Sequence, residues 1–342
     1  MQRINAKQLF ALAVVLSLTA ALPCAAQDGP LRQRMKERFQ EKMEKAPAPE
    51  ANAEVGVPLT KPGDYTFKIQ HDGLTRMYIV HVPQKYDPAV PTPLLLALHG
   101  GAGDMTRQAN DEYYGTIGAS EREGFVAVFP NGYSRFDSGK LATWNAGKCC
   151  GGARDRKVDD VGFLRRVVTN VSAQLNIDRR RVYATGMSNG AMMSYRLACE
   201  ASDVFRAVAA VAGTDNTVDC KPTQPVAVLH IHAKNDSHVL FEGGAGRGNR
   251  SSEQTTDYVS VPKTVAKWVQ LNGCAVQPQR IVEREGAYCE RYSGCREDAA
   301  VQLCVTETGD HSWPGGVKPQ QREPTSQALS ANEVMWEFFK RR

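Results

Sequence analysis

The stretch RVYATGMSNGAMMSYRLACE, residues 181–200, passes from a short apolar strand pattern to a helical pattern through a cluster of small residues. Gly186 and Gly190 flank Ser188 at the junction. A sharp strand-to-helix turn leaves no room for Cβ atoms at those two positions, and it raises the serine hydroxyl above the edge of a sheet. The stretch therefore predicts a nucleophilic serine. The alternative is a tight turn without a catalytic role.

Other strand and helix patterns surround this stretch. Two early strands alternate, as in an antiparallel hairpin, and the later ones are short apolar runs separated by helical segments, as in a buried parallel sheet. The predicted fold is a doubly wound, mostly parallel α/β sheet with antiparallel N-terminal strands and helices on both faces. We expect strands over 65–70, 75–82, 93–99, 125–129, 181–185, 206–212, 226–232 and 300–305, and helices over 161–176, 191–199, 261–270 and 328–340.

A serine hydroxyl needs a general base, which in such a fold follows the serine in the chain. His311 lies in TGDHSWPGG, just past the strand over 300–305, where catalytic groups of a parallel sheet gather. His230 and His232 lie within a predicted strand, where packing is the simpler role. We therefore take His311 as the base.

The acid that orients the imidazole should also follow a strand. Asp236 comes four residues after the strand over 226–232. Asp215, after the preceding strand, is the alternative, and Asp310 is adjacent to His311 and poorly placed to meet its ring. We expect Asp236 to be the acid.

The turn His99-Gly100-Gly101 follows another predicted strand, over 93–99. Its glycines would let the backbone approach a substrate carbonyl, so this turn would supply one half of an oxyanion hole and the N–H groups at the helix start, beginning with Asn189, the other half. A turn that needs positive φ is the alternative. Trp144 in TWNAG and Trp313 beside His311 are candidate substrate-binding residues or core residues, and His99 is a third candidate.

A metal site is the rival interpretation of HIHAKNDSH, which contains His230, His232, Asp236 and His238. Metallohydrolases with a His-x-His core place an acid two residues after the second histidine, and here that residue is Lys234, whose cation would repel a metal. Cys149-Cys150 lacks a second close pair with ligand spacing. We expect no metal and no cofactor.

Composition limits the class of protein. The chain has 342 residues, 42% of them hydrophobic and 23% charged, which is ordinary for a globular protein. The formal net charge is +5, but no basic block is interleaved with aromatic residues, so we expect no nucleic-acid partner. The charge allows a weak attraction to anionic surfaces or polymers.

The N-terminal region has the pattern of an export signal, residues 1–26, with Arg3 and Lys7 before an apolar run and a small-residue cleavage site near Ala26. An uncleaved anchor is the alternative. Removing Cys24 leaves eight of nine cysteines, so we expect a secreted protein with disulfides, whose pairing is one of about 105. No transmembrane segment is expected after the signal.

Residues 27–63 follow as a charged helical spacer and a Pro/Ala linker, and residues 64–342 form the catalytic domain. The segment 31–45 spaces its apolar residues four apart in an otherwise charged helix: Leu31, Met35, Phe39 and Met43. We expect a spacer, because so narrow an apolar stripe buries little area. A docking helix for a partner or the cell surface is the alternative. The sequence leaves the oligomeric state open.

The motifs LLLALHGG, WNAGKCCGGA, VDDVGF, ATGMSNGAMMSYRLAC, HIHAKND and GDHSWPGG together resemble the secreted esterase family of polyhydroxybutyrate depolymerases, feruloyl esterases and acetyl-xylan esterases. The resemblance covers roughly residue 64 to the C-terminus. It implies an α/β-hydrolase fold, Ser188 as nucleophile, Asp236 as acid, His311 as base, and Gly101 with Asn189 as oxyanion donors.

The resemblance also implies the substrate: a carboxylic ester cleaved through an acyl-enzyme, in a hydroxyalkanoate oligomer or amorphous polyester. The chain ends in the helix over 328–340 without an appended polymer-binding domain, so crystalline polyester is not the expected substrate. Feruloyl or acetyl-xylan esters and poly(aspartic acid) are the alternatives, and Met187 and Asn189 resemble the feruloyl esterase side of the family. A non-catalytic secreted binding protein is the alternative outside the enzyme class.

Overall fold

The computed structural model describes residues 30–246, 257–317 and 323–342. The predicted export signal lies outside these residues. The chain divides into two units, one up to Lys42 and one from Met43 to Arg342. Helix α1, Pro30–Glu44, occupies the segment where a spacer helix is expected. Its Met35 and Phe39 side chains are 65% and 50% exposed, and its role as a spacer stays a prediction.

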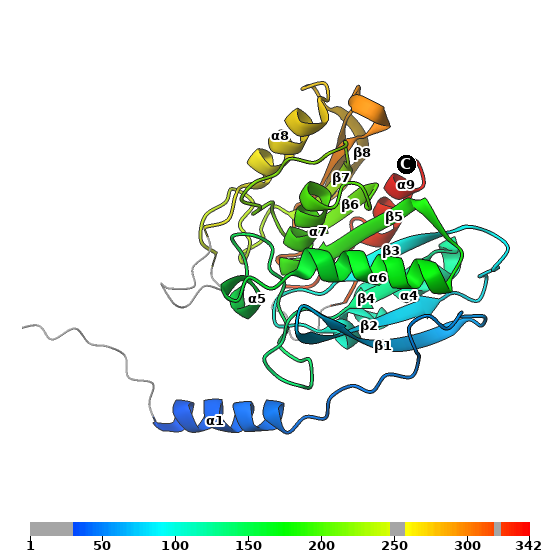
Figure 1. The fold of residues 1–342 in the computed structure, drawn as a ribbon. Coiled ribbons are helices and arrows are strands. Elements are labelled where there is room, and N and C mark those ends of the chain that lie inside the picture. Colours follow the sequence, from blue (N-terminus) through cyan, green and yellow to red (C-terminus); the bar gives the residue numbers. More distant parts are fainter. Residues whose placement is uncertain (1–29, 247–256, 318–322) are drawn as a thin grey trace, which may run out of the picture. The chain divides into compact units, whose positions relative to one another are not determined.

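A ten-stranded sheet forms the centre of the second unit (Figure 1), in the order β1-β2-β4-β3-β5-β6-β7-β10-β9-β8. The adjacent strands from β4 to β10 are parallel, and antiparallel pairs extend the sheet at both edges. The strands are β1 Gly63–His71, β2 Leu74–Val82, β3 Thr92–Leu98, β4 Val126–Pro130, β5 Ile177–Met187, β6 Ala207–Val211, β7 Ala227–Ala233, β8 Gln279–Arg284, β9 Ala287–Tyr292 and β10 Val301–Thr306. The predicted α/β architecture and its antiparallel start are confirmed.

The hairpin of β8 and β9 was not predicted. Strand β8 is exposed on nearly every residue and carries mostly polar side chains, so it lacks the apolar run that marks a buried strand. The turn Glu285-Gly286, with Gly286 at φ 74°, is the signal that would have revealed it, because a glycine of positive φ between two short runs is typical of a hairpin.

Strand residues alternate between two hydrophobic cores, one on each face of the sheet. Leu94, Leu96 and Leu98 pack in the core that includes α6, α7 and α8, whereas Leu95 and Ala97 pack in the core that includes α4 and α9. This is the period of two that a strand imposes.

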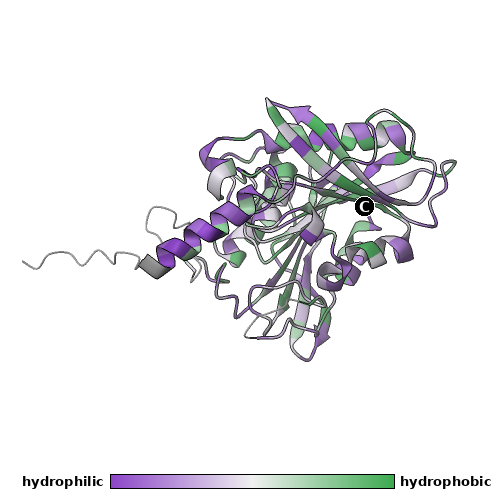
Figure 2. Cartoon of the chain, turned by 90° about the horizontal axis from the view of Figure 1, so that it is seen from below, coloured by the Kyte–Doolittle hydropathy of each residue, from purple (hydrophilic) through white to green (hydrophobic). Residues whose placement is uncertain are grey.

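The longer helices are α4 Thr116–Glu123, α6 Asp160–Gln174, α7 Asn189–Glu200, α8 Val261–Asn272 and α9 Ala331–Phe339, and the shorter ones are α2 Met105–Gln108, α3 Asp111–Tyr114, α5 Gly151–Asp155 and the 3-10 turn Arg296–Asp298. Figure 2 shows hydrophobic residues concentrated in the strands and mostly hydrophilic residues along α1.

The expected disulfides are present and use all eight of the cysteines after Cys24. The pairs are Cys149–Cys150, Cys199–Cys220, Cys274–Cys295 and Cys289–Cys304. The last pair joins β9 to β10 and so ties the unpredicted hairpin to the parallel core. None of the helices in the described part of the chain has the length and apolar character that a bilayer crossing requires.

A buried ion pair joins strand β2 to the first residue of α6. Arg76 on β2 donates to Asp160 at 2.6 Å, and the two side chains are 3% and 0% exposed. The other oxygen of Asp160 accepts the backbone N–H of Asn145 at 2.8 Å. Arg76 also lies over the ring of Phe163, 3.9 Å from its centroid. Arg76 also donates to Asn131 O at 3.1 Å, so the pair holds the segment 131–157 at Asn131 and at Asn145.

Replacing Asp160 by Asn tests this anchor. The change leaves the Arg76 charge buried without its counter-ion, so we expect the free energy of unfolding in urea to fall by about 3–5 kcal/mol. Asp203→Asn is the matched control, since Asp203 pairs with Arg165 at the surface with a 58% exposed side chain, and its loss should be below about 1 kcal/mol. Equal losses in the two variants would contradict this role.

Candidate active site

Ser188 stands at the junction of β5 and α7. Its backbone has φ 56° and ψ −119°, and its side chain is partly exposed whereas Met187 and Asn189 are buried. A positive φ is uncommon for a serine and is held here by the surroundings. A Cβ on Gly190 would overlap the carbonyl oxygen of Leu98, and one on Gly186 would lie 2.5 Å from the carbonyl carbon of Gly190. Both glycines are therefore needed where the sequence analysis expected them.

The end of β6 supports the same turn, which the sequence analysis did not foresee. The N–H of Ser188 donates to Val211 O at 2.9 Å. A Cβ on Gly213 would overlap the carbonyl oxygen of Ser188. The small residue after β6 thus lets the backbone pass close beneath Ser188.

Asp236 and His311 form a hydrogen-bonded pair at the same edge of the sheet. Asp236 follows β7 and His311 follows β10, and these strands run parallel to β5, which carries Ser188 at its end. His311 Nδ1 lies 2.9 Å from Asp236 Oδ2. The Asp236 side chain is fully buried and that of His311 is 13% exposed. The imidazole is therefore held at Nδ1 by a buried carboxylate, while its side chain stays partly accessible.

Four donors surround the Asp236 carboxylate. Its Oδ1 accepts the backbone N–H groups of His238 and Val239, each at 2.8 Å. Its Oδ2 lies 2.9 Å from His311 Nδ1 and 3.2 Å from His232 Nε2. Burial raises the pKa of Asp236, but the charge of His311 and the hydrogen bonds from His232 and His311 outweigh burial and hold that pKa well below its usual range. Asp236 is therefore ionised at every pH at which the protein is expected to work.

The two alternative acids have other partners. Asp215 Oδ2 accepts from Lys267 Nζ at 2.8 Å and from Trp268 Nε1 at 2.9 Å, and its Oδ1 accepts from Thr217. Asp310 Oδ1 accepts from the backbone and hydroxyl of Ser237, both at 2.8 Å. Both carboxylates therefore stabilise loops, whereas Asp236 accepts from the His311 ring.

The turn after β3 lies against the serine turn. A Cβ on Gly100 would lie 3.6 Å from Ser188 Cβ, and one on Gly101 would lie 3.7 Å from Asn189 Cβ. The Asn189 amide exchanges two hydrogen bonds with the backbone of Trp144, at 2.7 and 3.0 Å. The Asn189 side chain is thereby fixed, and its backbone N–H begins α7, where free N–H groups attract negative charge.

The three candidate substrate-binding residues are buried. Trp144, His99 and Trp313 are 0%, 1% and 3% exposed. Trp144 Nε1 donates to His99 O at 2.9 Å, and the two rings lie 4.9 Å apart. The Trp313 ring packs edge to face on Tyr114. Packing encloses all three side chains, as the alternative of core residues expects for the two tryptophans, and a substrate-binding role of Trp144, Trp313 or His99 stays a prediction.

His99 is neutral in this environment. Its Nε2 accepts the N–H of Gly132 at 2.9 Å, so its Nδ1 carries the proton and donates to Gly100 O at 2.8 Å. Burial lowers the pKa of His99 to about 4. With both nitrogens engaged, His99 holds the turn of Gly100 in place and is not a candidate base.

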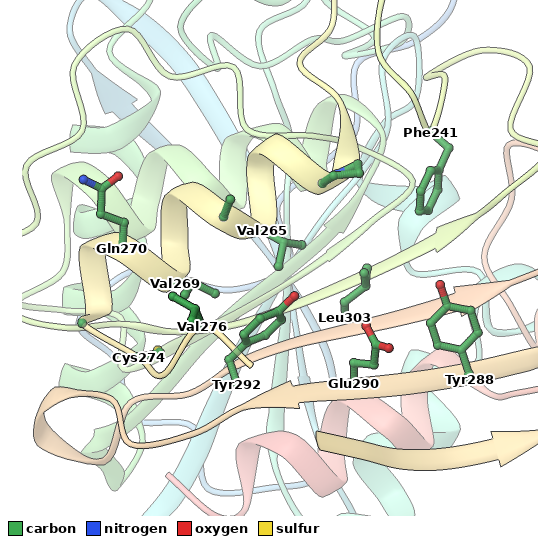
Figure 3. A pocket seen from close by; sticks show the side chains of 13 residues that line it. Phe241, Val265, Val269, Gln270, Cys274, Val276, Tyr288, Glu290, Tyr292 and Leu303 are labelled. Carbon is green, nitrogen blue, oxygen red and sulfur yellow. The ribbon is translucent and has the colours of Figure 1, made fainter. Parts of the chain in front are cut away.

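Two further features were missed by sequence reasoning, one beside His311 and one elsewhere in the second unit. His238 is partly exposed, and its ring lies 4.7 Å from the His311 ring, so it is a neighbour of any ligand at His311. An apolar pocket of about 540 Å³ lies between α8 and β9 (Figure 3), with Val265, Tyr288, Tyr292 and Leu303 in its walls. None of Ser188, Asp236 and His311 lines that pocket.

The described residues bring one group of cysteine and acid side chains within metal-binding distance of each other, Cys199, Asp215 and Cys220. Its cysteines form a disulfide. Of the histidines in the rival metal interpretation, His230 and His232 hydrogen-bond to each other and His232 donates to Val239 O.

Comparison with known proteins gives matches across most of the second unit. The model of the family described as Esterase PHB depolymerase matches residues 78–246. A probable feruloyl esterase C of Aspergillus clavatus is 30% identical over 273 residues, which cover 77% of this chain and 83% of that protein. Feruloyl esterase B of Piromyces equi is 28% identical over 246 residues, which cover 70% of this chain and 43% of that protein.

A solved structure has a similar fold. An acetyl xylan esterase from Aspergillus awamori superimposes with a TM-score of 0.54 over 80% of this chain and 98% of that chain, at 13% identity. The superposition supports the arrangement of the sheet and its helices. At so low an identity it supports no statement about the substrate.

The burial of His99 makes stability depend on pH. Its folded pKa of about 4 lies below the unfolded value of about 6.5. The unfolded chain therefore binds more protons between these values, and stability falls as the pH falls below about 6.5. We expect His99 to account for a loss on the order of 1–2 kcal/mol between pH 7 and pH 5.

His99→Gln, which keeps a donor and an acceptor but does not titrate, should lose less stability over that interval than the original chain. Urea unfolding of both proteins at pH 7 and pH 5 measures the difference. Parallel losses would show that His99 is not the titrating group.

Proposed function

Because the chain belongs to the esterase family that groups polyhydroxybutyrate depolymerases with feruloyl esterases, we propose that it is a serine esterase that cleaves carboxylic esters through an acyl-enzyme. The observation that carries the proposal is a juxtaposition at one sheet edge. Ser188 stands on a strained turn with φ 56°, and the Asp236–His311 pair, joined at 2.9 Å, follows two strands parallel to the one before the serine.

In the first half of the proposed reaction, His311 Nε2 takes the hydroxyl proton as Ser188 Oγ attacks the ester carbonyl carbon. The N–H groups of Asn189 and Gly101 donate to the oxyanion. The bond from carbon to the alcohol oxygen then breaks, and His311 gives its proton to that oxygen. Asp236, ionised and fixed by four donors, stabilises the imidazolium in between.

The second half repeats these steps with water. His311 takes a proton from water as the water oxygen attacks the acyl carbon. The bond to Ser188 Oγ breaks, the proton returns to that oxygen, and the carboxylic acid leaves. The residues supply every proton transfer, and the reaction requires no cofactor.

For substrate, we propose esters of hydroxyalkanoate oligomers or amorphous polyester, in line with the family model over residues 78–246. Feruloyl esters are the second candidate, favoured by the 30% identity to a probable feruloyl esterase C. We further propose that the protein is secreted, since four disulfides fit an oxidising compartment.

Replacing Ser188 by Ala tests the serine mechanism. We expect hydrolysis of p-nitrophenyl butyrate to fall at least 10³-fold, because the nucleophile is gone, and labelling by a fluorophosphonate to disappear. Ser172→Ala is the control, since the Ser172 hydroxyl on α6 is buried without a recorded partner. Full activity of Ser188→Ala would overturn the proposal.

A hydrolysis panel tests the substrate. With hydroxybutyrate trimer, methyl ferulate, acetylated xylan and poly(aspartate) compared by kcat/KM, we expect the hydroxybutyrate trimer to rank first. Methyl ferulate in first place would favour the second candidate. Turnover of poly(aspartate) alone would contradict both.

A further inference from the structure

A buried chain of hydrogen bonds leads from α7 through β7 to Asp236. Tyr195 Oη lies 2.7 Å from His230 Nδ1, and His230 Nε2 lies 3.0 Å from His232 Nδ1. His232 Nε2 lies 2.8 Å from Val239 O and 3.2 Å from Asp236 Oδ2. Tyr195 and His230 are 0% exposed and His232 is 1% exposed. We propose that His232 is a positioning residue that acts through Asp236, and that Tyr195 and His230 fix its tautomer. This inference rests on the serine mechanism proposed above.

The proton positions follow from the partners at both ends of the chain. A buried phenol O–H needs an acceptor, and His230 Nδ1 is the partner of Tyr195 Oη recorded in the described residues. His230 therefore accepts at Nδ1 and carries its proton on Nε2, which donates to His232 Nδ1. At the other end, Val239 O accepts only, so His232 carries its proton on Nε2. Tyr195 at one end and Val239 O at the other therefore require the same tautomer, with the proton on Nε2, for both histidines.

This arrangement makes every donor point toward the acid. The rings of His230 and His232 stack with centroids 5.1 Å apart, and burial lowers the pKa of His230 well below its usual range. In a chain of hydrogen bonds each donor polarises the next. The Nε2–H of His232 is therefore directed, with a definite tautomer, at Val239 O and Asp236 Oδ2.

The geometry gives His232 a task that the rest of the site does not perform. Asp236 and His311 both lie on loops that follow strands, whereas His232 lies within β7. Backbone N–H groups fix Oδ1 of Asp236, and His232 is the partner on a strand for Oδ2, the oxygen that receives His311 Nδ1. Phe241 packs edge to face on the His232 ring, with centroids 6.0 Å apart, and limits its rotation. His232 thus ties the acid to the sheet and sets the direction from which His311 is held.

Two matched variants test the proposal. His232→Gln places an amide N–H near the position of His Nε2, whereas the shorter His232→Asn places it near Nδ1 and cannot reach Asp236. With p-nitrophenyl butyrate we expect kcat of His232→Asn to fall about 10- to 100-fold, as for the loss of a hydrogen bond to a charged group. KM should stay within about 3-fold, and His232→Gln should recover most of kcat. Active sites are counted by fluorophosphonate titration, so that unfolded protein does not enter kcat.

An unchanged kcat in His232→Asn would overturn the proposal, as would an equal loss in His232→Gln, since a merely structural histidine would not distinguish the two amides. Tyr195→Phe is the second test, for the case that neither His232 variant folds. It should lower kcat about 2- to 10-fold, because without the Tyr195 hydroxyl His230 is no longer held in the tautomer that donates to His232. Tyr183→Phe, which removes a buried phenol that donates to Phe339 O at 3.1 Å, should leave kcat unchanged. Equal kcat values for the two tyrosine variants would overturn the proposal.

Failure of the serine mechanism has a different signature. In that case the original chain itself would neither hydrolyse the ester nor react with the fluorophosphonate. Failure of the positioning role leaves that reactivity intact and removes only the difference between the amide variants.

Discussion

The close approach of three backbone segments at the end of β5 is the constraint on which the site depends. Leu98 at the end of β3, the turn from Gly186 to Gly190, and Gly213 after β6 lie so near one another that a Cβ on any of these glycines would meet backbone atoms. This contact gives Ser188 its positive φ and brings Gly100 beside it. The strand order β3-β5-β6 makes the approach obligatory, because hydrogen-bonded strands lie only about 4.8 Å apart. A side chain at any of the glycines would separate the serine from its neighbours.

Burial then decides how the polar groups around this contact are charged. His99 and His230 are enclosed and neutral, whereas Asp236 is enclosed and ionised because four donors meet it. The same principle operates beside the segment 131–157, where the buried side chains of Arg76 and Asp160 pair with each other. The polar groups beneath the site are thus largely paired before any substrate arrives, as a preorganised site requires.

Much of this arrangement could be predicted because strand order along the chain follows simple patterns. Apolar runs located the central strands, and the rule that ligands gather at carboxyl ends selected Ser188, Asp236 and His311 as neighbours. Their catalytic roles stay proposals. For Trp144 the choice between a substrate-binding and a core residue could not be made, and the burial of His99 was not predicted, since local sequence does not show which loop covers which. The link from His232 to Asp236 was also missed, because it depends on a tautomer that Tyr195 and Val239 determine from separate elements.

The polarity of β8 has a consequence beyond making it hard to find in the sequence. A sheet of ten strands must end somewhere, and here one end is a strand whose exposed side chains include Arg280, Glu283 and Arg284. A neighbouring copy that tried to extend the sheet would have to match or desolvate these charges. The charged edge strand therefore disfavours the stacking of copies into a continuous sheet, which is the first step of fibre formation.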